Sequence, residues 1–387
     1  MGISVRFLVL PFLVCGMLVA RPVPPRTRIV VGVKPGMDVV ADQLMNGKGK
    51  AFKIKEIRMI VLEVSENAID GIRNSLKKRS DVFSYVEDDV YGSTEATPTD
   101  PLIVQQSWTV KSVFKTPPGT PGAWDLSKGG AIVGEIDSGI DGRHPDLAGK
   151  VLGGWDLLTR SMVMAGANSD TGCETGHGTA VAGTIAALTN NMVGIAGGAW
   201  LSPIIPLVVT NSGCYAWWSD IAAAAVYAVN AGAKVINISI WGPTDSSGLE
   251  SGLAYAYGHN VPIIAAAGNN GNTVPGYPAH SPYVTASVGA VNPSDVRCPF
   301  SNYGAAATIF ALGCNVYTTQ RGGTYGWWYG TSFATPIVTA AVALLKTLKP
   351  NATIAQIKVF LGNNSDNTQA GPRLNAWKLL VAAQALP

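Results

Sequence analysis

The sequence predicts an α/β protein in which a doubly wound, mostly parallel sheet is flanked by helices and preceded by a small α+β domain. From about residue 130 onward, strand-like runs alternate with helical runs, as in right-handed βαβ units. Several strand-like runs are apolar at every position, so both faces of those strands must be buried. Charged residues are unevenly distributed along the chain. Residues 21–93 hold 13 basic and 10 acidic residues, whereas the much longer remainder, Arg6 aside, holds 14 basic and 15 acidic residues.

The small domain is expected between residues 28 and 91, where short apolar runs rich in Val and Ile surround one helical stretch. Its expected elements are strands at 28–33, 58–63 and 83–87 and a helix at 68–78. The polar, turn-rich run 92–100 that follows is typical of an exposed linker.

The large domain carries the alternating pattern. Its first strands are expected at 131–136, 203–210, 234–240 and 261–267, with helices at 179–188, 219–230 and 248–258. Later elements are expected as short strands at 283–292 and 308–312, a helix at 332–348 and terminal helices at 353–361 and 375–385. The helix expected at 332–348 tolerates Pro336 if this proline falls in its first turn. In such sheets ligands bind beyond the carboxyl ends of the strands, so the chemistry is expected there.

The first twenty residues are predicted to be an export signal. Arg6 gives a basic start, 7–14 is apolar, and Ala20 is a small residue at the expected cleavage point. We therefore expect a secreted protein, and no later stretch is expected to be long and uncharged enough for a membrane span. The net charge of +3, with no basic run interleaved with aromatic residues, argues against a nucleic-acid partner.

Four cysteines remain after the signal, an even number that favours disulfides in an exported chain. They allow three pairings, of which we expect Cys173–Cys214 and Cys298–Cys314. No C-x-x-C spacing indicates zinc.

Three short motifs place reactive side chains where an element meets a turn. Asp137 ends an apolar strand in 135–139, His177 opens a helix in 176–179, and Ser332 opens another in 330–336. Singly, each has a structural explanation: an aspartate forms turns, a histidine can be a satisfied interior group, and a serine caps helices. Together they supply a nucleophile, a base that is neutral near pH 7 and a carboxylate that fixes the imidazole tautomer.

The order acid, histidine, serine matches one known arrangement of this triad, and 100–356 resembles the subtilases, within them the thermitase-like group. The resemblance also rests on these stretches: 144–150 (HPDLAGK), 153–156 (GGWD), 189–191 (TNN), 194–197 (GIAG) and 265–269 (AAAGN). It implies a subtilisin-like fold and serine endopeptidase activity through an acyl-enzyme, with Asp137, His177 and Ser332 as the triad. It also implies that Asn269 holds the oxyanion, together with the backbone N–H of Ser332.

The resemblance further implies where substrate binds: as an extended strand beside Ser239, Ile240, Trp241 and Gly242, with Ala267 and Gly268 lining the opposite wall of the P1 pocket. Trp241 stands where the family usually has glycine. Its indole either narrows the cleft, offers a stacking surface, or turns away and packs, so the family's preference for large apolar P1 side chains is not assumed for this chain.

A structural Ca²⁺ site is the cofactor that the resemblance implies. The matching ligands are the side chains of Asp100, Asp146 and Asn191 and the backbone carbonyls of Leu188, Val193 and Ile195. Hard oxygen donors, two of them carboxylates, suit Ca²⁺.

Residues 28–91 resemble the propeptide that assists folding of these proteases and blocks their cleft. The expected division is a signal peptide at 1–20, an inhibitory propeptide at 21–93 and a peptidase domain at 94–387, with self-processing within 91–99. We expect a monomer whose partners are protein or peptide substrates and its own propeptide.

The alternative function is a catalytically silent subtilase that binds or inhibits, against which the complete triad and Asn269 argue. A dinucleotide-binding enzyme is rejected because no G-x-G-x-x-G follows a strand.

Overall fold

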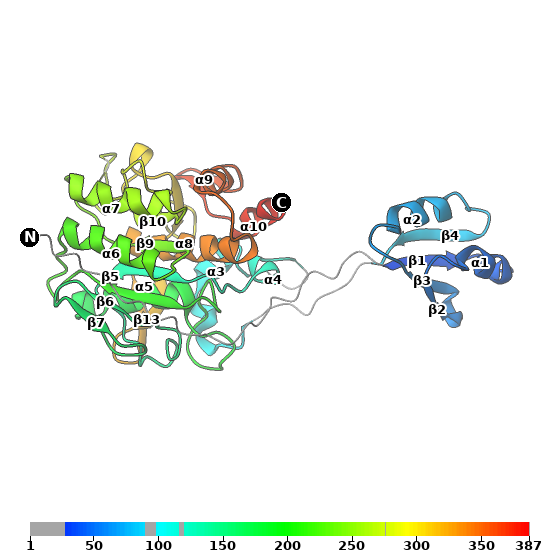
Figure 1. Cartoon of the computed structure of the whole chain (residues 1–387), viewed down its shortest axis with the longest axis horizontal. Coiled ribbons are helices and arrows are strands. Elements are labelled where there is room, and N and C mark those ends of the chain that lie inside the picture. The colour runs from blue at the N-terminus through cyan, green and yellow to red at the C-terminus, as the bar shows by residue number, and fades with distance from the viewer. Residues whose placement is uncertain (1–27, 90–97, 116–119, 275, 387) are drawn as a thin grey trace, which may run out of the picture. The chain divides into compact units, whose positions relative to one another are not determined.

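The computed structural model describes residues 28–89, 98–115, 120–274 and 276–386 of the chain, which divide into two compact units, 28–89 and 98–386 (Figure 1). The predicted signal peptide and most of the predicted processing region lie outside the described residues.

The N-terminal unit is an antiparallel sheet of four strands in the order β2-β3-β1-β4, with two helices. Its elements are β1 (Arg28–Val33), α1 (Asp38–Met45), β2 (Lys50–Ile54), β3 (Met59–Glu63), α2 (Ile69–Lys77) and β4 (Phe83–Asp88). The predicted strands and helix are confirmed, whereas α1 and β2 were not predicted. All five residues of β2 are exposed, so this edge strand carries no apolar alternation that the sequence could reveal.

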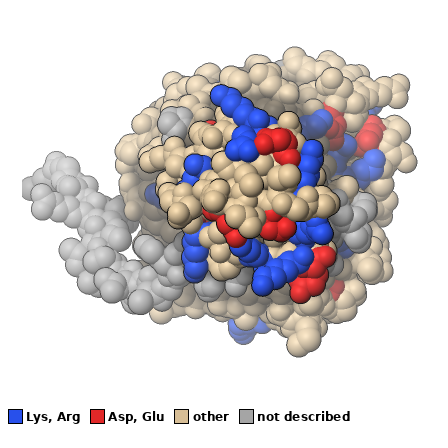
Figure 2. Space-filling model, turned by 90° about the vertical axis from the view of Figure 1, so that its right-hand side faces the viewer, with Lys and Arg blue, Asp and Glu red and all other residues tan. Residues whose placement is uncertain are grey.

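Charged side chains cover much of the surface of this unit, where Lys and Arg alternate with Asp and Glu (Figure 2). Many are paired: Arg73, for example, donates to Asp88 at 2.6 Å and also contacts Asp70. The dense mixed charge seen in the sequence is therefore a solvated surface of paired groups over a small apolar core.

The larger unit is built on a ten-stranded sheet in the order β15-β16-β12-β11-β10-β9-β5-β8-β6-β7, whose central pairs are parallel. Its strands are β5 (Val133–Asp137), β6 (Gly154–Asp156), β7 (Ser161–Val163), β8 (Ile204–Val208), β9 (Val235–Ile238), β10 (Ile263–Ala266), β11 (Ala286–Val291), β12 (Ile309–Leu312), β15 (Asp366–Thr368) and β16 (Gly371–Arg373). A separate hairpin joins β13 (Val316–Gln320) to β14 (Thr324–Trp328). The predicted fold class is confirmed.

Helices cover both faces of this sheet (Figure 1). On one face lie α6 (Trp218–Asn230) and α7 (Ser247–Gly258), and on the other α5 (His177–Ala186), α8 (Thr331–Leu348) and α10 (Ala376–Gln384). The remaining helices are α3 (Ser107–Lys111), α4 (Ala123–Leu126) and α9 (Ile354–Asn363). Gly134 allows the close approach of β5 and α6, because a Cβ there would lie 2.9 Å from the Cβ of Ala228.

The long apolar helix α8 is the centre of the core. Of the described helices, α8 alone is long and apolar enough to cross a membrane, and 83% of it is buried inside the fold. The prediction that no later stretch has the length and composition of a span is therefore wrong for 331–348. Pro336 is the sixth residue of α8 and lies in its second turn, so the condition for its compatibility with this helix, a place in the first turn, is not met.

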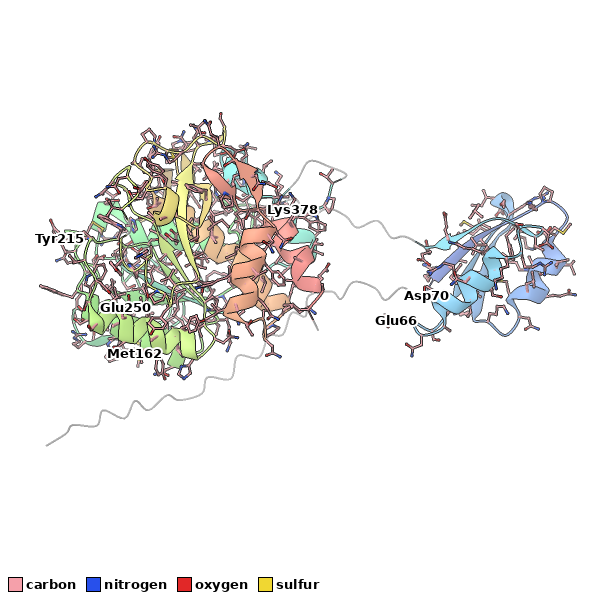
Figure 3. All side chains as sticks on the ribbon, turned by 90° about the horizontal axis from the view of Figure 1, so that it is seen from above. Glu66, Asp70, Met162, Tyr215, Glu250 and Lys378 are labelled. Atoms are coloured by element: carbon pink, nitrogen blue, oxygen red, sulfur yellow. A yellow bond between two sulfur atoms is a disulfide. The ribbon has the colours of Figure 1, made fainter. Side chains whose placement is uncertain are left out.

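Two disulfides have the expected pairing, Cys173–Cys214 and Cys298–Cys314. The first ties the turn before α5 to the loop after β8. Tyr215, next to Cys214, is 78% exposed and points outward from the larger unit (Figure 3). This bridge therefore fixes the entry to α5 from a loop that is otherwise on the surface.

Replacing both cysteines of each bridge by serine should lower the free energy of unfolding. The loops closed are 41 and 16 residues long, so loop entropy predicts losses of about 4 and 3 kcal/mol for the Cys173–Cys214 and Cys298–Cys314 bridges, respectively. Urea unfolding of both double variants, made inactive by Ser332→Ala to prevent self-digestion, measures this. Unchanged unfolding midpoints would contradict it.

Candidate active site

Asp137 is the last residue of β5 and lies where the order of the strands reverses. After β5 the chain forms β6, β7 and β8 on one side of β5 and then returns to form β9 on the other side. This reversal is a topological switch point. The side chain is 1% exposed, and its Oδ1 accepts the backbone N–H of Ser138 at 2.7 Å.

His177 is the first residue of α5, and its Nδ1 lies 2.8 Å from Oδ1 of Asp137. Gly178 makes this approach possible, since a Cβ there would lie 2.2 Å from the carbonyl oxygen of Gly139. Asp170 caps α5 from outside the helix, because its Oδ2 accepts the backbone N–H of Thr179 at 3.2 Å and also the Thr179 hydroxyl. The sequence analysis did not find Asp170, which has no local capping spacing to reveal it.

Opposing effects act on the pKa of His177. Burial lowers this pKa, but the negative charge of Asp137 and the hydrogen bond to it raise it, helped by Glu174 and Asp170, and the net result is a raised pKa. Asp137 thus stabilises the imidazolium, the form that a general base adopts after taking a proton.

Ser332 is the second residue of α8 and is joined to Ser239 by two reciprocal hydrogen bonds. The Ser332 hydroxyl donates to the carbonyl of Ser239 at 3.1 Å, and the Ser239 hydroxyl donates to the carbonyl of Ser332 at 2.8 Å. The second bond compensates for Pro336, which has no N–H to give to the carbonyl four residues earlier.

The rings of His177 and Phe333 lie 5.1 Å apart between centroids, which brings the start of α8 to the imidazole. In the part of the chain described, no hydrogen bond joins His177 to Ser332. The serine hydroxyl must turn from Ser239 toward Nε2 for the two to meet, and such bonds commonly tighten only when substrate is bound.

Asn269 follows β10 and is oriented by Thr331. Its Oδ1 accepts both the backbone N–H and the hydroxyl of Thr331, each at 2.9 Å. The amide oxygen is therefore engaged, and the Nδ2 group is the one left to donate, beside Gly330, whose missing side chain leaves space in front of it.

Comparison with known proteins shows which of them this chain is similar to. The family model described as "Subtilase family" matches residues 128–376. Thermitase of Thermoactinomyces vulgaris is 36% identical over 289 residues, which are 73% of this chain and 98% of thermitase. A protease structure from Pseudoalteromonas arctica superposes with a TM-score of 0.67 at 28% identity, over 74% of this chain and 100% of that one. Fervidolysin from Fervidobacterium pennivorans, described as a keratinolytic enzyme related to subtilisin, superposes with a TM-score of 0.65 at 25% identity, over 92% of this chain and 61% of the fervidolysin chain.

The chain belongs to the subtilase family. It is a subtilisin-like serine endopeptidase, as the resemblance predicted.

The predicted substrate edge of this subtilase, 239–242, follows β9. Gly242 exchanges both of its backbone hydrogen bonds with Tyr277, at 2.9 and 2.8 Å, so its N–H and C=O already have partners. Ser239 is buried, Ile240 and Trp241 are half-buried, and on the opposite wall Ala267 and Gly268 are buried.

The six predicted calcium ligands gather around the loop 188–195. Asp146 receives the N–H of Ile195 and the amide of Asn191 on its two carboxylate oxygens, at 2.8 and 3.0 Å, and its backbone carbonyl receives the N–H of Leu188. Asp100 accepts the N–H groups of 190 and 191, and the N–H of Val193 goes to Oδ1 of Asn191. The amide of Asn191 therefore presents its nitrogen to Asp146 and would have to turn over to act as an oxygen ligand.

Both carboxylates of this cluster are buried, and burial is the main cause that raises the pKa of each. Neither has an ion-pair partner among the described residues. A group of three or more His, Cys, Asp or Glu that could hold a metal is likewise absent from the described part, so a cation here would depend on two carboxylates, an amide and carbonyl oxygens.

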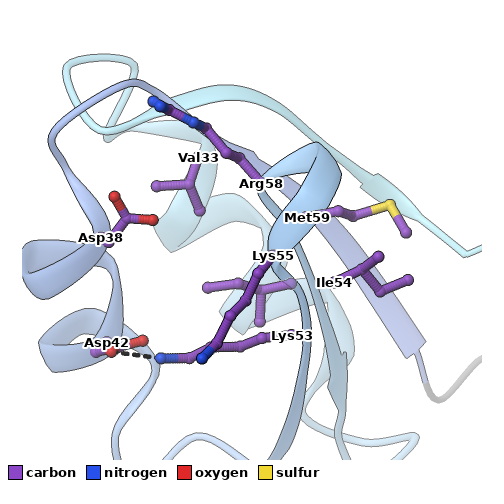
Figure 4. Close-up of a pocket in the computed structure, with 9 residues that line it drawn as sticks. Val33, Asp38, Asp42, Lys53, Ile54, Lys55, Arg58 and Met59 are labelled. Atoms are coloured by element: carbon purple, nitrogen blue, oxygen red, sulfur yellow. Dashed lines mark hydrogen bonds and ion pairs between the residues drawn. The ribbon is translucent and has the colours of Figure 1, made fainter.

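A hollow of about 290 Å³ lies in the N-terminal unit, where Asp42 pairs with Lys53 (Figure 4). Its lining includes none of the predicted site residues. We assign no chemistry to it.

Glu135 is a buried carboxyl group to which the sequence analysis gave no role. It precedes Asp137 by two residues on β5, so both side chains lie on the same face of the strand. Neither of its oxygens, nor Oδ2 of Asp137, has a hydrogen-bond partner within the described ranges. Burial raises the pKa of Glu135 well above its ordinary value, and the charges of Asp137 and Asp170 raise it further. A charged residue inside an otherwise apolar strand was the signal that could have identified it.

Glu135 should make stability depend on pH. Its folded pKa lies above its unfolded one, so the folded state binds the extra proton and stability falls as pH rises above about 4.5, by up to ~1.4 kcal/mol per pH unit, until the folded pKa is passed. Glu135→Gln, in the Ser332→Ala background, should remove this fall.

Urea unfolding at several pH values measures the difference between the variant and its parent. The exposed Glu66, changed to Gln, is the matched control and should leave the slope unchanged. Parallel pH profiles for Glu135→Gln and its parent would show that Glu135 is not held protonated.

Proposed function

We propose that this subtilase is a secreted endopeptidase that hydrolyses peptide bonds within proteins through an acyl-enzyme on Ser332, and that it is made as a self-processed zymogen. The observation that carries the proposal is the buried pair of His177 and Asp137 at 2.8 Å, at the sheet edge where α8 presents Ser332. The comparisons support the reaction class, and the residue roles are our assignment.

In the proposed mechanism the hydroxyl of Ser332 turns toward Nε2 of His177 and attacks the scissile carbonyl. His177 takes the hydroxyl proton and later gives it to the leaving amine, while Asp137 holds the Nδ1–H tautomer and stabilises the imidazolium. Water then repeats the sequence to release the acyl group. Because the raised pKa of His177 favours the charged form, the base is lost when the pH falls below that pKa.

The oxyanion is proposed to lie between Nδ2 of Asn269 and the backbone N–H of Ser332. Thr331 engages the amide oxygen of Asn269 twice, so the donor is oriented before the reaction begins. The peptide is proposed to lie along 239–241, ahead of Gly242, whose backbone is paired with Tyr277. Ala267 is fully buried, its N–H donates to the carbonyl of Val288 and its own carbonyl accepts from Asn302, so its proposed part in the P1 wall is limited to packing.

The N-terminal unit is proposed to be the inhibitory propeptide, within the expected range 21–93, with 1–20 as the signal and 94–387 as the peptidase domain. Its independent antiparallel sheet and core support an autonomous folding unit. Two disulfides in the larger unit support export. We propose a monomer with no nucleic-acid partner and no membrane span, in which α8 is a core helix.

Calcium fits the cluster of Asp100, Asp146 and Asn191, because the two buried carboxylates have no ion-pair partner among the residues that the structure describes. Gly194 admits the close approach of the loop, since a Cβ there would lie 2.2 Å from Oδ2 of Asp146. The proposed ligands also include the carbonyls of Leu188, Val193 and Ile195. Bound calcium would neutralise the carboxylates and rigidify the loop, with no part in the chemical step.

A serine-directed fluorophosphonate should label the mature protein once, at Ser332, and Ser332→Ala should abolish the label. The same substitution should lower kcat on a protein substrate about 10⁶-fold, because the nucleophile is lost. Mass spectrometry of the labelled peptide and hydrolysis of casein are the two measurements.

A folded wild-type protein that takes no label and cleaves nothing would instead indicate the silent, binding subtilase. Ser301→Ala, which changes a buried serine on the loop before β12, is a control for serine removal in general and should keep the label if the variant folds.

Calcium should raise the thermal unfolding midpoint of the mature protein. At 100 times the dissociation constant, binding adds about 2.7 kcal/mol, or roughly 5 °C for a domain of this size. Asp146→Asn should lose most of this calcium-dependent shift, whatever its own midpoint, while exposed Asp245→Asn keeps it. Calorimetry with and without a chelator measures the calcium-dependent shift of the unfolding midpoint in each variant. A shift in Asp146→Asn equal to that of the wild type would contradict the assigned site.

A further inference from the structure

The indole of Trp241 fills a slot between two glycines. A Cβ built on Gly276 would lie 1.7 Å from the indole Nε1, and one built on Gly268 would lie 2.4 Å from the same atom. Distances this short show that the ring lies directly against both backbones, with no room for a side chain between them. Both glycines are buried, whereas Trp241 is half-buried and so closes the slot from its open side.

This slot lies beside the atoms that the proposed reaction uses. Gly268 immediately precedes Asn269, and Trp241 comes two residues after Ser239, whose carbonyl accepts the hydroxyl of Ser332. The third side is fixed by the pairing of Gly242 with Tyr277, which follows Gly276. The predicted P1 pocket lies between 239–242 and 267–268, and the indole, which lies against Gly268, therefore occupies space beside a predicted wall of that pocket.

Packing alone holds the ring there. Its Nε1 is buried and has no hydrogen-bond partner among the residues described. An N–H that is buried without a partner costs free energy, so the Nε1 group does not favour this position of the ring. The indole is held in the slot by its packing contacts. The glycines on both sides are what give the ring its space, and an alanine at either position would collide with it.

We propose that Trp241 closes the P1 pocket and restricts this subtilase to cleavage after small residues such as Gly, Ala and Ser. The inference rests on the proposed function, since it takes Ser332 as nucleophile and Asn269 as the oxyanion donor. Trp241 is then a specificity-determining residue that acts by exclusion: a large P1 side chain must displace an indole to enter. One methylene in a hydrophobic pocket is worth about 10–200-fold in kcat/KM, and exclusion of a whole side chain is expected to discriminate by at least the lower figure.

The test compares peptides that differ only at P1, carrying Ala, Leu or Phe. The mature enzyme is titrated with the fluorophosphonate, so that each kcat/KM refers to active sites. The wild type should prefer Ala to Phe by at least about 10-fold, and Trp241→Gly should raise kcat/KM for Phe at least about 10-fold while changing that for Ala less. Trp241→Ala and Trp241→Val should fall between, in order of size, and provide the series if the glycine variant does not fold.

A second substitution checks that the vacated space is the pocket. Adding Gly276→Ala to Trp241→Gly places a methyl group where the indole was, so the gain on Phe should largely disappear. Trp327→Ala, on the half-exposed face of β14, is the control for tryptophan loss and should leave the Ala/Phe ratio unchanged.

Equal cleavage after Phe and Ala by the titrated wild type would overturn the proposal, because the ring would then move aside freely. An unchanged ratio in Trp241→Gly would overturn it too, with the proposed function intact. Absence of both label and cleavage in the wild type would overturn the proposed function itself and this inference with it.

Discussion

The hydrogen bond between Asp137 and His177 is the interaction on which the site depends. It joins the end of β5 to the start of α5 across a gap that Gly178 keeps narrow, inside a core where both side chains are nearly excluded from water. Burial alone would lower the pKa of the imidazole; the adjacent carboxylate reverses that direction. Capping by Asp170 and the Cys173–Cys214 bridge hold the entry to α5, so the imidazole is fixed from both sides.

Much of this could be predicted from sequence because the reactive residues stand where elements begin or end. Asp137 closes an apolar strand and His177 opens a small-residue helix, and the parallel sheet brings such junctions to one edge. The sequence could not show β2, which has no buried residue, or the pairing of Gly242 with Tyr277, which is a contact between distant segments. The hydroxyl of Ser332 bonded to Ser239, and the position of Pro336 in the second turn, likewise depend on tertiary packing rather than on any local pattern.

Two residues near the site break local rules. Glu135 places a carboxyl group in the interior strand that carries Asp137, and Trp241 places the largest side chain beside two glycines. Real folds usually accept such conflicts where function requires them. In our account Glu135 makes the stability of the fold depend on pH, and Trp241 is proposed to limit the volume available to substrate.

A crystal structure of the mature enzyme carrying a peptidyl phosphonate would show which residue is the nucleophile and which groups surround the adduct. We expect a covalent bond from Oγ of Ser332, with Nε2 of His177 and Nδ2 of Asn269 within hydrogen-bond distance of the adduct and Nδ1 of His177 still bonded to Asp137. An adduct on another residue, or an imidazole of His177 directed away from both Asp137 and the adduct, would contradict it.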